Sequence, residues 1–264
     1  MKIERAALTQ MAVVDVHCHA DIPWQGVETT AAMLMALAAR ERMAYVLMLG
    51  REWEKQVPVL RKGAGRFGLM MWVKPGEAGW WEGCETFLLA NRDVVKGVKL
   101  PPSMDGYVAG MGTLERVFAA ANERDFVIVT HTDETAPSRA GNFAQLLEKY
   151  PQTKLVLYHA WPLDEAVELI KAFANVYMDT SYTAFGPAVQ RKALEAVGRE
   201  KILFGIDSPL GFPVREGAYL PHWRDVVEKE LAEWYGQEAE VIESVVWRNA
   251  VRLLGLGEGL GTRE

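Results

Sequence analysis

The stretch AVVDVHCH at residues 12–19 combines the apolar pattern of a β-strand with two histidines separated by a single residue. Side chains alternate between the two faces of a strand, so Asp15, His17 and His19 are predicted to share one face, opposite the intervening valines and cysteine. Two imidazoles on one face can bind the same metal ion, and strand-borne ligands are held rigidly. The alternative is a strand that merely carries polar residues near its end. The positions of the other histidines decide between the two.

The composition is that of an ordinary globular protein of 264 residues, with 50% hydrophobic and 24% charged residues and a formal net charge of −6. This length is typical of one TIM barrel, and we expect residues 1–264 to form a single domain. No basic block is present to contact phosphates, so the sequence predicts no nucleic-acid partner and no membrane partner. The charged N-terminus lacks the apolar run of a signal peptide, and the apolar stretch at residues 31–39 is too short to cross a bilayer. We therefore expect a cytoplasmic protein.

Short apolar runs alternate with amphipathic stretches along the chain, which is the pattern of βα units and a parallel sheet. Eight such units in a chain of this length favour a closed (β/α)8 TIM barrel over an open sheet, with extra helices at the C-terminus. The strands are predicted at residues 12–18, 44–49, 67–73, 94–100, 126–130, 154–158, 176–179 and 202–206. The helices are predicted at residues 27–42, 77–91, 114–124, 140–150, 164–173, 188–198, 223–234 and 238–254, with a weaker one at 52–62 that Pro58 interrupts.

Four of the five histidines fall at the carboxyl ends of predicted strands. His17 and His19 end the first strand, His131 follows the fifth, and His159 follows the sixth. Asp207 follows the eighth strand. The chemistry of a barrel enzyme takes place at this end of the strands, and a random scatter would rarely bring four histidines there. The positions therefore favour a metal site over histidines that are satisfied within the core.

This set of residues resembles the metal site of the metal-dependent amidohydrolase superfamily. More narrowly, it is similar to the amidohydrolase-related (amidohydrolase 2) branch, which also includes decarboxylases. Two further stretches agree, because LFGIDSP at residues 203–209 resembles the strand-eight motif of that branch and NAVRLL at residues 249–254 resembles its closing helix. The resemblance spans the chain. It is specific for the fold and the metal site, and it says little about the substrate.

The resemblance implies a role for each of the strand-end residues. His17, His19 and Asp207 would bind a divalent metal ion, expected to be zinc, and His131 would complete the ligand set. Asp207 would also act as the catalytic acid/base that moves a proton from water to the leaving group, unless it is a helix N-cap. His159 would either bind a second metal ion or act in catalysis by donating a hydrogen bond to the substrate carbonyl. Such an ion lowers the pKa of bound water from 15.7 to about 7.

Lys99, near the end of the fourth strand, is open to three interpretations. In binuclear members of the superfamily a lysine on this strand is carbamylated and bridges two metal ions. The alternatives are an ammonium that binds an anionic group of the substrate, which we favour together with a single ion, and a surface lysine on a wrongly assigned strand. Arg51, after the second strand, can join Lys99 in clamping a carboxylate, because a guanidinium offers two parallel donors.

Three other residues are candidates for supporting roles in the pocket. Trp24 and Trp161 can wall an apolar or aromatic substrate, although most buried tryptophans serve packing. Asp15 is expected to orient a metal ligand rather than to bind the metal itself.

The sequence leaves three functions open. The leading hypothesis is a metal-dependent hydrolase that cleaves a small-molecule amide, ester or lactone with a metal-activated water. The second is a metal-dependent non-oxidative decarboxylase of a small aromatic or enol carboxylic acid, which Arg51 and Lys99 together favour. The third is a non-catalytic barrel that acts as a binding protein and holds no metal. The outer helices are compatible with a homodimer, although no stretch marks an interface.

Overall fold

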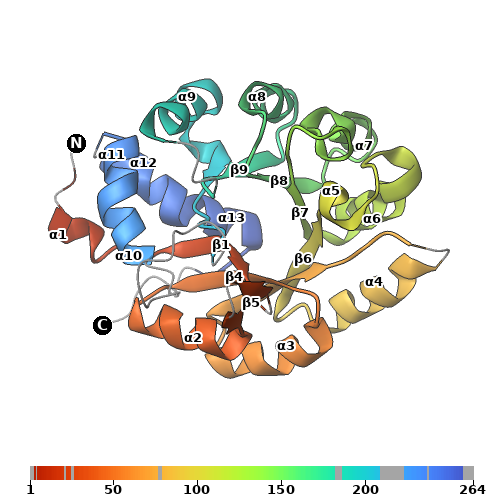
Figure 1. The fold of residues 1–264 in the computed structure, drawn as a ribbon, viewed down its shortest axis with the longest axis horizontal. Coiled ribbons are helices and arrows are strands. Elements are labelled where there is room, and N and C mark those ends of the chain that lie inside the picture. The colour runs from red at the N-terminus through yellow and green to blue at the C-terminus, as the bar shows by residue number, and fades with distance from the viewer. Residues whose placement is uncertain are drawn as a thin grey trace.

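The predicted (β/α)8 barrel is confirmed in the computed structural model, which describes residues 3, 5–20, 22–24, 27–76, 79–181, 186–208, 223–236 and 238–257. Eight parallel strands form one sheet in which each strand pairs with the next along the chain. The helices surround this sheet (Figure 1). The strands are β1 (Val14–His19), β4 (Tyr45–Gly50), β5 (Phe67–Trp72), β6 (Val95–Leu100), β7 (Val127–His131), β8 (Lys154–Tyr158), β9 (Val176–Asp179) and β10 (Ile202–Leu203).

The barrel closes between the first and the last strand. Only Ile202 and Leu203 of β10 join the sheet ladder with β9, so this strand is shorter than the predicted 202–206. The residues that follow turn to β1 instead. The backbone N–H of Val16 donates to Phe204 O at 3.0 Å, and Cys18 forms a parallel bridge with Ser208. Residues 204–208 therefore lie beside β1 and bring the end of the barrel against its beginning.

Most helices lie where the amphipathic pattern predicts them. The predicted helix at residues 27–42 is the exception, because α2 (Ala31–Arg40) begins only after Thr30, whose Oγ1 accepts a hydrogen bond from the N–H of Met33 at 3.2 Å. Such an N-cap fixes the start of a helix. The preceding residues form a short antiparallel hairpin of β2 (Ile22–Trp24) and β3 (Val27–Thr29). Pro58 lies inside α3 (Trp53–Leu60) without ending it.

The remaining helices complete the outer layer. Both predicted C-terminal helices contain a π-helical segment, η5 (Val226–Leu231) in the first and η6 (Ser244–Arg248) in the second.

Within the described residues, no helix combines the length and the apolar character that crossing a bilayer requires. The other helices are α1 (Arg5–Leu8), η1 (Arg61–Gly63), α4 (Trp80–Ala90), α5 (Pro102–Asp105), α6 (Met111–Arg124), η2 (Ala136–Ser138), η3 (Ala140–Phe143), α7 (Ala144–Lys149), α8 (Leu163–Ala172), α9 (Pro187–Val197), η4 (Arg199–Lys201), α10 (Trp223–Asp225), α11 (Ala232–Trp234), α12 (Ala239–Glu243) and α13 (Asn249–Leu254).

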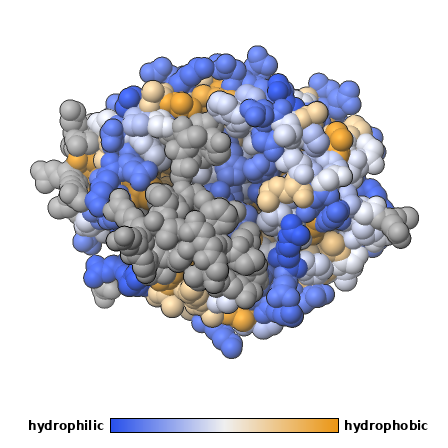
Figure 2. Space-filling model, in the orientation of Figure 1, coloured by the Kyte–Doolittle hydropathy of each residue, from blue (hydrophilic) through white to orange (hydrophobic). Residues whose placement is uncertain are grey.

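The core has two parts. The inner part lies within the barrel, where side chains from six strands pack together with Ala250 and Leu253 of α13. The outer part joins the other face of the sheet to the surrounding helices. A filled interior is typical of this fold and restricts the chemistry to the ends of the strands. On the face shown in Figure 2, hydrophobic residues form small groups among hydrophilic ones, because most large apolar side chains belong to these two core layers.

The first strand contains a β-bulge between Asp15 and Cys18. Asp15 is aligned with Val46 of β4, and the next aligned residues are Cys18 and Met48. Residues 16 and 17 of β1 therefore oppose a single residue of β4, which defines a bulge. One extra residue reverses the alternation of the side chains that follow it.

The bulge corrects the prediction that Asp15, His17 and His19 share one face. Val16 packs in the inner core, where the unbroken alternation would have put Asp15 and the two histidines. The Asp15 carboxylate instead accepts a hydrogen bond from the indole Nε1 of Trp223 in α10, at 2.5 Å. His17 and His19 still meet at the mouth of the barrel, because the inserted residue turns them toward its interior. The sequence pattern misplaced Asp15 because it assumes an unbroken register.

Candidate metal centre

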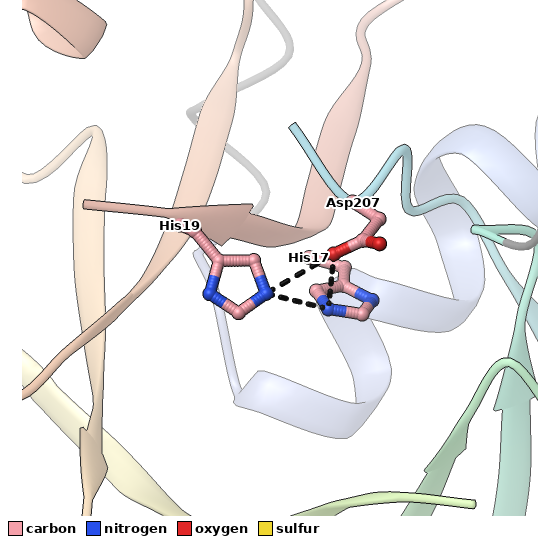
Figure 3. Close-up of side chains that lie close together, drawn as sticks. All are labelled: His17, His19 and Asp207. Atoms are coloured by element: carbon pink, nitrogen blue, oxygen red, sulfur yellow. Dashed lines mark hydrogen bonds and ion pairs between the residues drawn. The ribbon is translucent and has the colours of Figure 1, made fainter. Parts of the chain in front are cut away.

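His17, His19 and Asp207 converge where the first and last strands meet, and all three are buried (Figure 3). The Nε2 atoms of the two imidazoles lie 3.3 Å apart, and Oδ1 of Asp207 lies 3.1 Å from each of them. Among the histidine, cysteine and carboxylate side chains of the described ranges, these three form the group whose ligand atoms all lie within 4.8 Å of one another. Residues about 190 positions apart in the sequence thus present two nitrogens and one oxygen to a common point.

The spacing of these three atoms fits a shared divalent cation. Ligand bonds of about 2.0–2.1 Å in tetrahedral geometry put neighbouring ligand atoms about 3.3 Å apart. Although Asp207 Oδ1 is buried, it makes no hydrogen bond to any residue in the described part of the chain. Buried polar atoms without such a partner are uncommon, and a cation would supply one here. Imidazole nitrogen with carboxylate oxygen is a donor set that zinc accepts.

His17 is oriented by a second carboxylate. Its Nδ1 lies 2.7 Å from Oδ2 of Asp179 and 3.0 Å from Oγ of Ser181, so the Nδ1–H donates to these oxygens. The lone pair of Nε2 then points toward Asp207, as metal binding requires. Burial lowers the pKa of His17, but the carboxylates of Asp207 and Asp179 outweigh burial and raise the pKa above its ordinary value. The two carboxylates therefore favour a positive charge at this point.

The other two members of the group are in the protonation states that a metal site needs. Burial lowers the pKa of His19 to about 4, so its imidazole is neutral at pH 7. Burial raises the pKa of Asp207, but the neighbouring His17 and His19 outweigh it and hold this pKa well below its usual range. At neutral pH the group thus offers a neutral imidazole and an ionised carboxylate.

Gly205 makes room for the contact between His17 and Asp179. A Cβ atom at this position would lie 2.9 Å from both Oδ2 of Asp179 and Cβ of His17. Contacts this short require the neighbouring atoms to move, so only glycine fits without displacing the pair. The glycine is one residue of the segment that closes the barrel against β1.

Two of the strand ends carry unusual backbone conformations. Asp207 has a φ of 53° and His159 a φ of 70°, and Ala160 follows with a φ of 47°. Residues other than glycine adopt this left-handed region at a cost of about 1–3 kcal/mol each. Such strain persists where the surrounding structure over-determines the conformation, and it concentrates at functional sites. Here it sets the direction of two side chains at the mouth of the barrel.

His131 and His159 lie next to the group of three but outside it. The two rings meet edge to face with their centroids 4.7 Å apart, and the His159 centroid lies 5.2 Å from that of His17. His159 Nδ1 lies 3.2 Å from Ser181 Oγ, and His131 Nε2 lies 3.1 Å from Oδ2 of Asp133. Burial lowers the pKa of His131 to about 4 and that of His159 to about 3, so both rings are neutral at pH 7. Metal binding by these two residues remains a prediction.

Lys99 is a buried cation beside the centre, which excludes the interpretation as a surface lysine. It lies on β6 with only 1% of its surface exposed. Its Nζ lies 4.4 Å from the centroid of the Tyr158 ring, and the other contact of that ring is a 3.7 Å stack with His17. Within the described part of the chain, no hydrogen bond or ion pair engages this Nζ. Burial lowers the pKa of Lys99 to about 8, although nearby carboxylates, Asp207 foremost, act in the opposite direction.

Arg51 is held in place by two residues that the sequence did not indicate. Its guanidinium carbon lies 4.2 Å from the centroid of the Trp72 ring, and its Nη2 donates to Oδ1 of Asp105 at 3.1 Å. The indole Nε1 of Trp72 donates to Oδ2 of the same carboxylate at 2.8 Å. The Trp72 ring also lies 5.8 Å from the ring of His19. Arg51 is therefore preorganised on a tryptophan that contacts the candidate metal site.

Of the two predicted tryptophan contacts, Trp161 is the one whose side chain the structure describes. Trp161 follows β8 and is 36% exposed, and its indole donates to Oε2 of Glu134 at 3.3 Å. The side chain of Trp24 lies outside the described residues.

The sequence contained a partial signal for the residues that were missed. Asp179 ends the predicted strand 176–179 and Trp72 lies near the end of 67–73, so the rule that found the histidines also points to these two. Asp105 lies in α5, after the fourth strand has ended, and nothing in its neighbourhood marks it.

The chain resembles known proteins in both sequence and structure. The amidohydrolase family model matches residues 60–256. No curated protein sequence matches the chain. Apo IDCase from Metarhizium anisopliae has a TM-score of 0.71 at 14% identity, over 95% of this chain and 98% of that chain. A probable 2-pyrone-4,6-dicarboxylic acid hydrolase from Acinetobacter baumannii, with citric acid bound, has a TM-score of 0.65 at 13% identity, over 93% and 100% of the two chains. A 2,6-dihydroxybenzoate decarboxylase in complex with 2,6-dihydroxybenzoate has a TM-score of 0.59 at 12% identity, over 93% and 98%.

Proposed function

The chain belongs to the amidohydrolase family, and on this premise we propose that it is a metal-dependent hydrolase of a small-molecule amide, ester or lactone. The observation that carries the proposal is the convergence of His17, His19 and Asp207, whose three ligand atoms lie 3.1–3.3 Å apart. A site with three protein ligands leaves a position for water or substrate, which distinguishes catalytic from structural zinc sites. Zinc is the ion we assign to it.

A divalent ion bound there would supply a Lewis acid for the substrate carbonyl and would lower the pKa of water from 15.7 to about 7. His131, whose Nε2 lies 3.1 Å from Oδ2 of Asp133, is our candidate for a fourth ligand, and a further position would be left for water or substrate. The two oxygens of the Asp207 carboxylate are oriented differently. Oδ1 faces the two imidazoles, and the other oxygen points away from them (Figure 3). We assign to Asp207 the transfer of a proton from water to the leaving group, for which it is ionised at neutral pH.

The hydrogen bonds of Ser181 support one of the two roles considered for His159. Ser181 Oγ lies 3.0 Å from Nδ1 of His17 and 3.2 Å from Nδ1 of His159. If the Ser181 hydroxyl donates to Nδ1 of His159 rather than to the carboxylate of Asp179, the proton of His159 resides on Nε2. An Nε2–H can donate to a carbonyl oxygen that gains negative charge in the transition state. We therefore assign His159 to the substrate rather than to a second metal ion.

We propose that Lys99 binds an anionic group of the substrate, with Arg51 further out. A buried ammonium without a directly bound counter-ion costs on the order of several kcal/mol, and the carboxylates near Lys99 offset only part of this cost. Lys99 lies close to the candidate metal centre, because its Nζ and the imidazole of His17 both contact the ring of Tyr158. A buried ammonium at this position is therefore placed to bind an anionic group of the substrate. Arg51 is partly neutralised by Asp105, so its contribution is the weaker one. Trp161 and Trp24 remain our candidates for the residues that line the substrate-binding pocket.

The second candidate function is the non-oxidative decarboxylation of a small aromatic or enol acid. The observation that favours it is Lys99, a buried cation beside the centre that no hydrogen bond or ion pair of the described residues engages and that can hold a carboxylate. One structural relative is named as a 2,6-dihydroxybenzoate decarboxylase. In such a reaction Asp207 or His159 would deliver the proton to the carbon that loses carbon dioxide.

The test combines elemental analysis with two assays. Protein purified after growth with added zinc is expected to hold about one equivalent of divalent metal per chain. Hydrolysis is assayed over a panel of amides, esters and lactones, and carbon dioxide release over aromatic and enol acids. His17→Ala and Asp207→Asn are expected to abolish turnover, whereas Asp93→Asn, an exposed carboxylate paired with Arg61, leaves it unchanged. Metal below about one-tenth of an equivalent would support a non-catalytic binding protein instead.

A further inference from the structure

We propose that Asp15 and Trp223 form a positioning pair that holds the bulge of β1 and thereby aims His17 at the metal centre. The bulge creates the need for such a pair. An inserted residue drops out of the ladder between strands, so its backbone N–H loses its regular partner. In this strand the N–H of His17 donates to Oδ1 of Asp15 at 2.8 Å instead. The side chain two residues before the ligand thus fixes the backbone that carries it.

The second oxygen of Asp15 ties this arrangement to the C-terminal helices. Its Oδ2 accepts the indole Nε1–H of Trp223 at 2.5 Å, and both side chains are completely buried. Trp223 itself is held by its neighbour Arg224. The guanidinium of Arg224 donates to Met11 O at 2.8 Å and to Glu41 O at 2.9 Å, which lie before β1 and before β4. The indole of Trp223 is therefore held in place, and its hydrogen bond fixes the position of the Asp15 carboxylate.

The chemistry of the pair explains why a carboxylate occupies this position. Three N–H donors reach the side chain, from the backbones of His17 and Ile206 and from the indole of Trp223, and only a carboxylate presents acceptors to all of them. Asparagine would turn an amide N–H₂ toward one of them. The group formed by His17, His19 and Asp207 does not include Asp15, so this carboxylate acts on the metal through His17. Residues that orient a metal ligand in this way typically change metal affinity by about 10–100-fold when they are replaced.

The test compares Trp223→Phe and Asp15→Asn with a matched control, Trp81→Phe. Trp81 is also buried, at 2% exposure, but its Nε1 has no hydrogen-bond partner in the described ranges. Both Trp→Phe changes remove a similar amount of buried ring, and only the change at 223 removes a bond to Asp15. Zinc affinity is measured by competition with a chromogenic chelator. The visible absorption of the Co²⁺-loaded protein reports the geometry of the ligands.

Trp223→Phe and Asp15→Asn are expected to weaken zinc affinity about tenfold or more and to shift the cobalt spectrum. Trp81→Phe is expected to leave both unchanged, even if it lowers the melting temperature as much. Amide hydrogen exchange of the metal-free protein tests the pair without any ion, and the His17 amide is expected to exchange faster in the first two variants alone. Wild-type affinity, spectrum and exchange in Trp223→Phe would overturn the inference. A wild-type protein that binds no metal but shows this exchange pattern would count against the proposed function instead.

Discussion

Oδ2 of Asp179 lies 2.7 Å from Nδ1 of His17, and both side chains are completely buried. The other oxygen of this carboxylate accepts the backbone N–H of His159 at 2.9 Å. Asp179 therefore sets the proton of one histidine and the backbone of another, although it does not belong to the group of three ligand atoms.

Asp179→Asn is expected to lower zinc affinity by about 10–100-fold while the three ligands stay in place. The amide is a weaker acceptor for the Nδ1–H, and it no longer favours a positive charge on the ring. Isothermal titration calorimetry with zinc measures the effect. Asp164→Asn serves as the control because its side chain is 82% exposed. Equal affinities for the wild type and Asp179→Asn would remove Asp179 from the site.

Gly205→Ala is expected to destabilise the protein by about 1–3 kcal/mol, because the new methyl group overpacks the contact between His17 and Asp179. Urea denaturation measures the free energy of unfolding. Gly83→Ala is the control, since a Cβ at this helical position has no heavy atom within 4 Å. That change is expected to stabilise the protein, because alanine is the better helix former. A neutral Gly205→Ala would show that the pair can move apart freely.

The activity toward an anionic substrate is expected to fall as pH rises through about 8, the pKa to which burial lowers Lys99. Below this pH the ammonium is charged and binds the anion, and above it the amine is neutral. The profile of kcat/KM against pH tests this. Lys99→Met should raise KM and lose this limb of the profile, whereas Lys96→Met on the same strand should retain it. A carbamylated Lys99 would instead make activity depend on added bicarbonate.

Lys99→Met is also expected to stabilise the fold by on the order of 2 kcal/mol at pH 7, because it removes a buried charge. The sign follows from the lowered pKa of Lys99. Between about pH 8 and 10.5 the unfolded chain binds the proton and the folded chain does not, so the wild type gains stability as pH rises. The advantage of the variant should therefore shrink over this range. Denaturation of both proteins at pH 7 and pH 10 measures it, and a less stable variant at pH 7 would contradict the burial argument.

The sequence was sufficient for the barrel because its strands are apolar runs separated by amphipathic helices, and all eight occur near their predicted positions, although β10 ends at Leu203 instead of residue 206. The sequence did not predict those features of the fold that depend on a single residue. The hydroxyl of Thr30 starts α2 later than the apolar pattern indicates. The bulge at residues 16 and 17 leaves no trace in the alternation of apolar and polar residues, so the direction of Asp15 was predicted wrongly.

The candidate site was predictable to the extent that its residues end strands. His17, His19 and Asp207 were expected to meet because parallel strands bring their carboxyl ends together. The residues that position these three were not predicted, because their contacts join distant parts of the sequence. Trp223 is 208 residues from Asp15, and Asp105 meets Trp72 across a gap of 33 residues. Such pairs depend on the packing of whole elements rather than on any local pattern.

The bridge between Cys18 and Ser208 joins the two ends of the barrel, and it carries His17 and Asp207 to one point. A ribosome releases the first of these ligands long before the last. During synthesis the growing chain therefore exposes two histidines without the carboxylate that completes the proposed set, and its affinity for an ion would stay low until residue 207 has emerged. If these residues hold an ion as proposed, loading requires Asp207, and a nascent chain stalled before residue 207 would bind the ion weakly however well its early strands had folded.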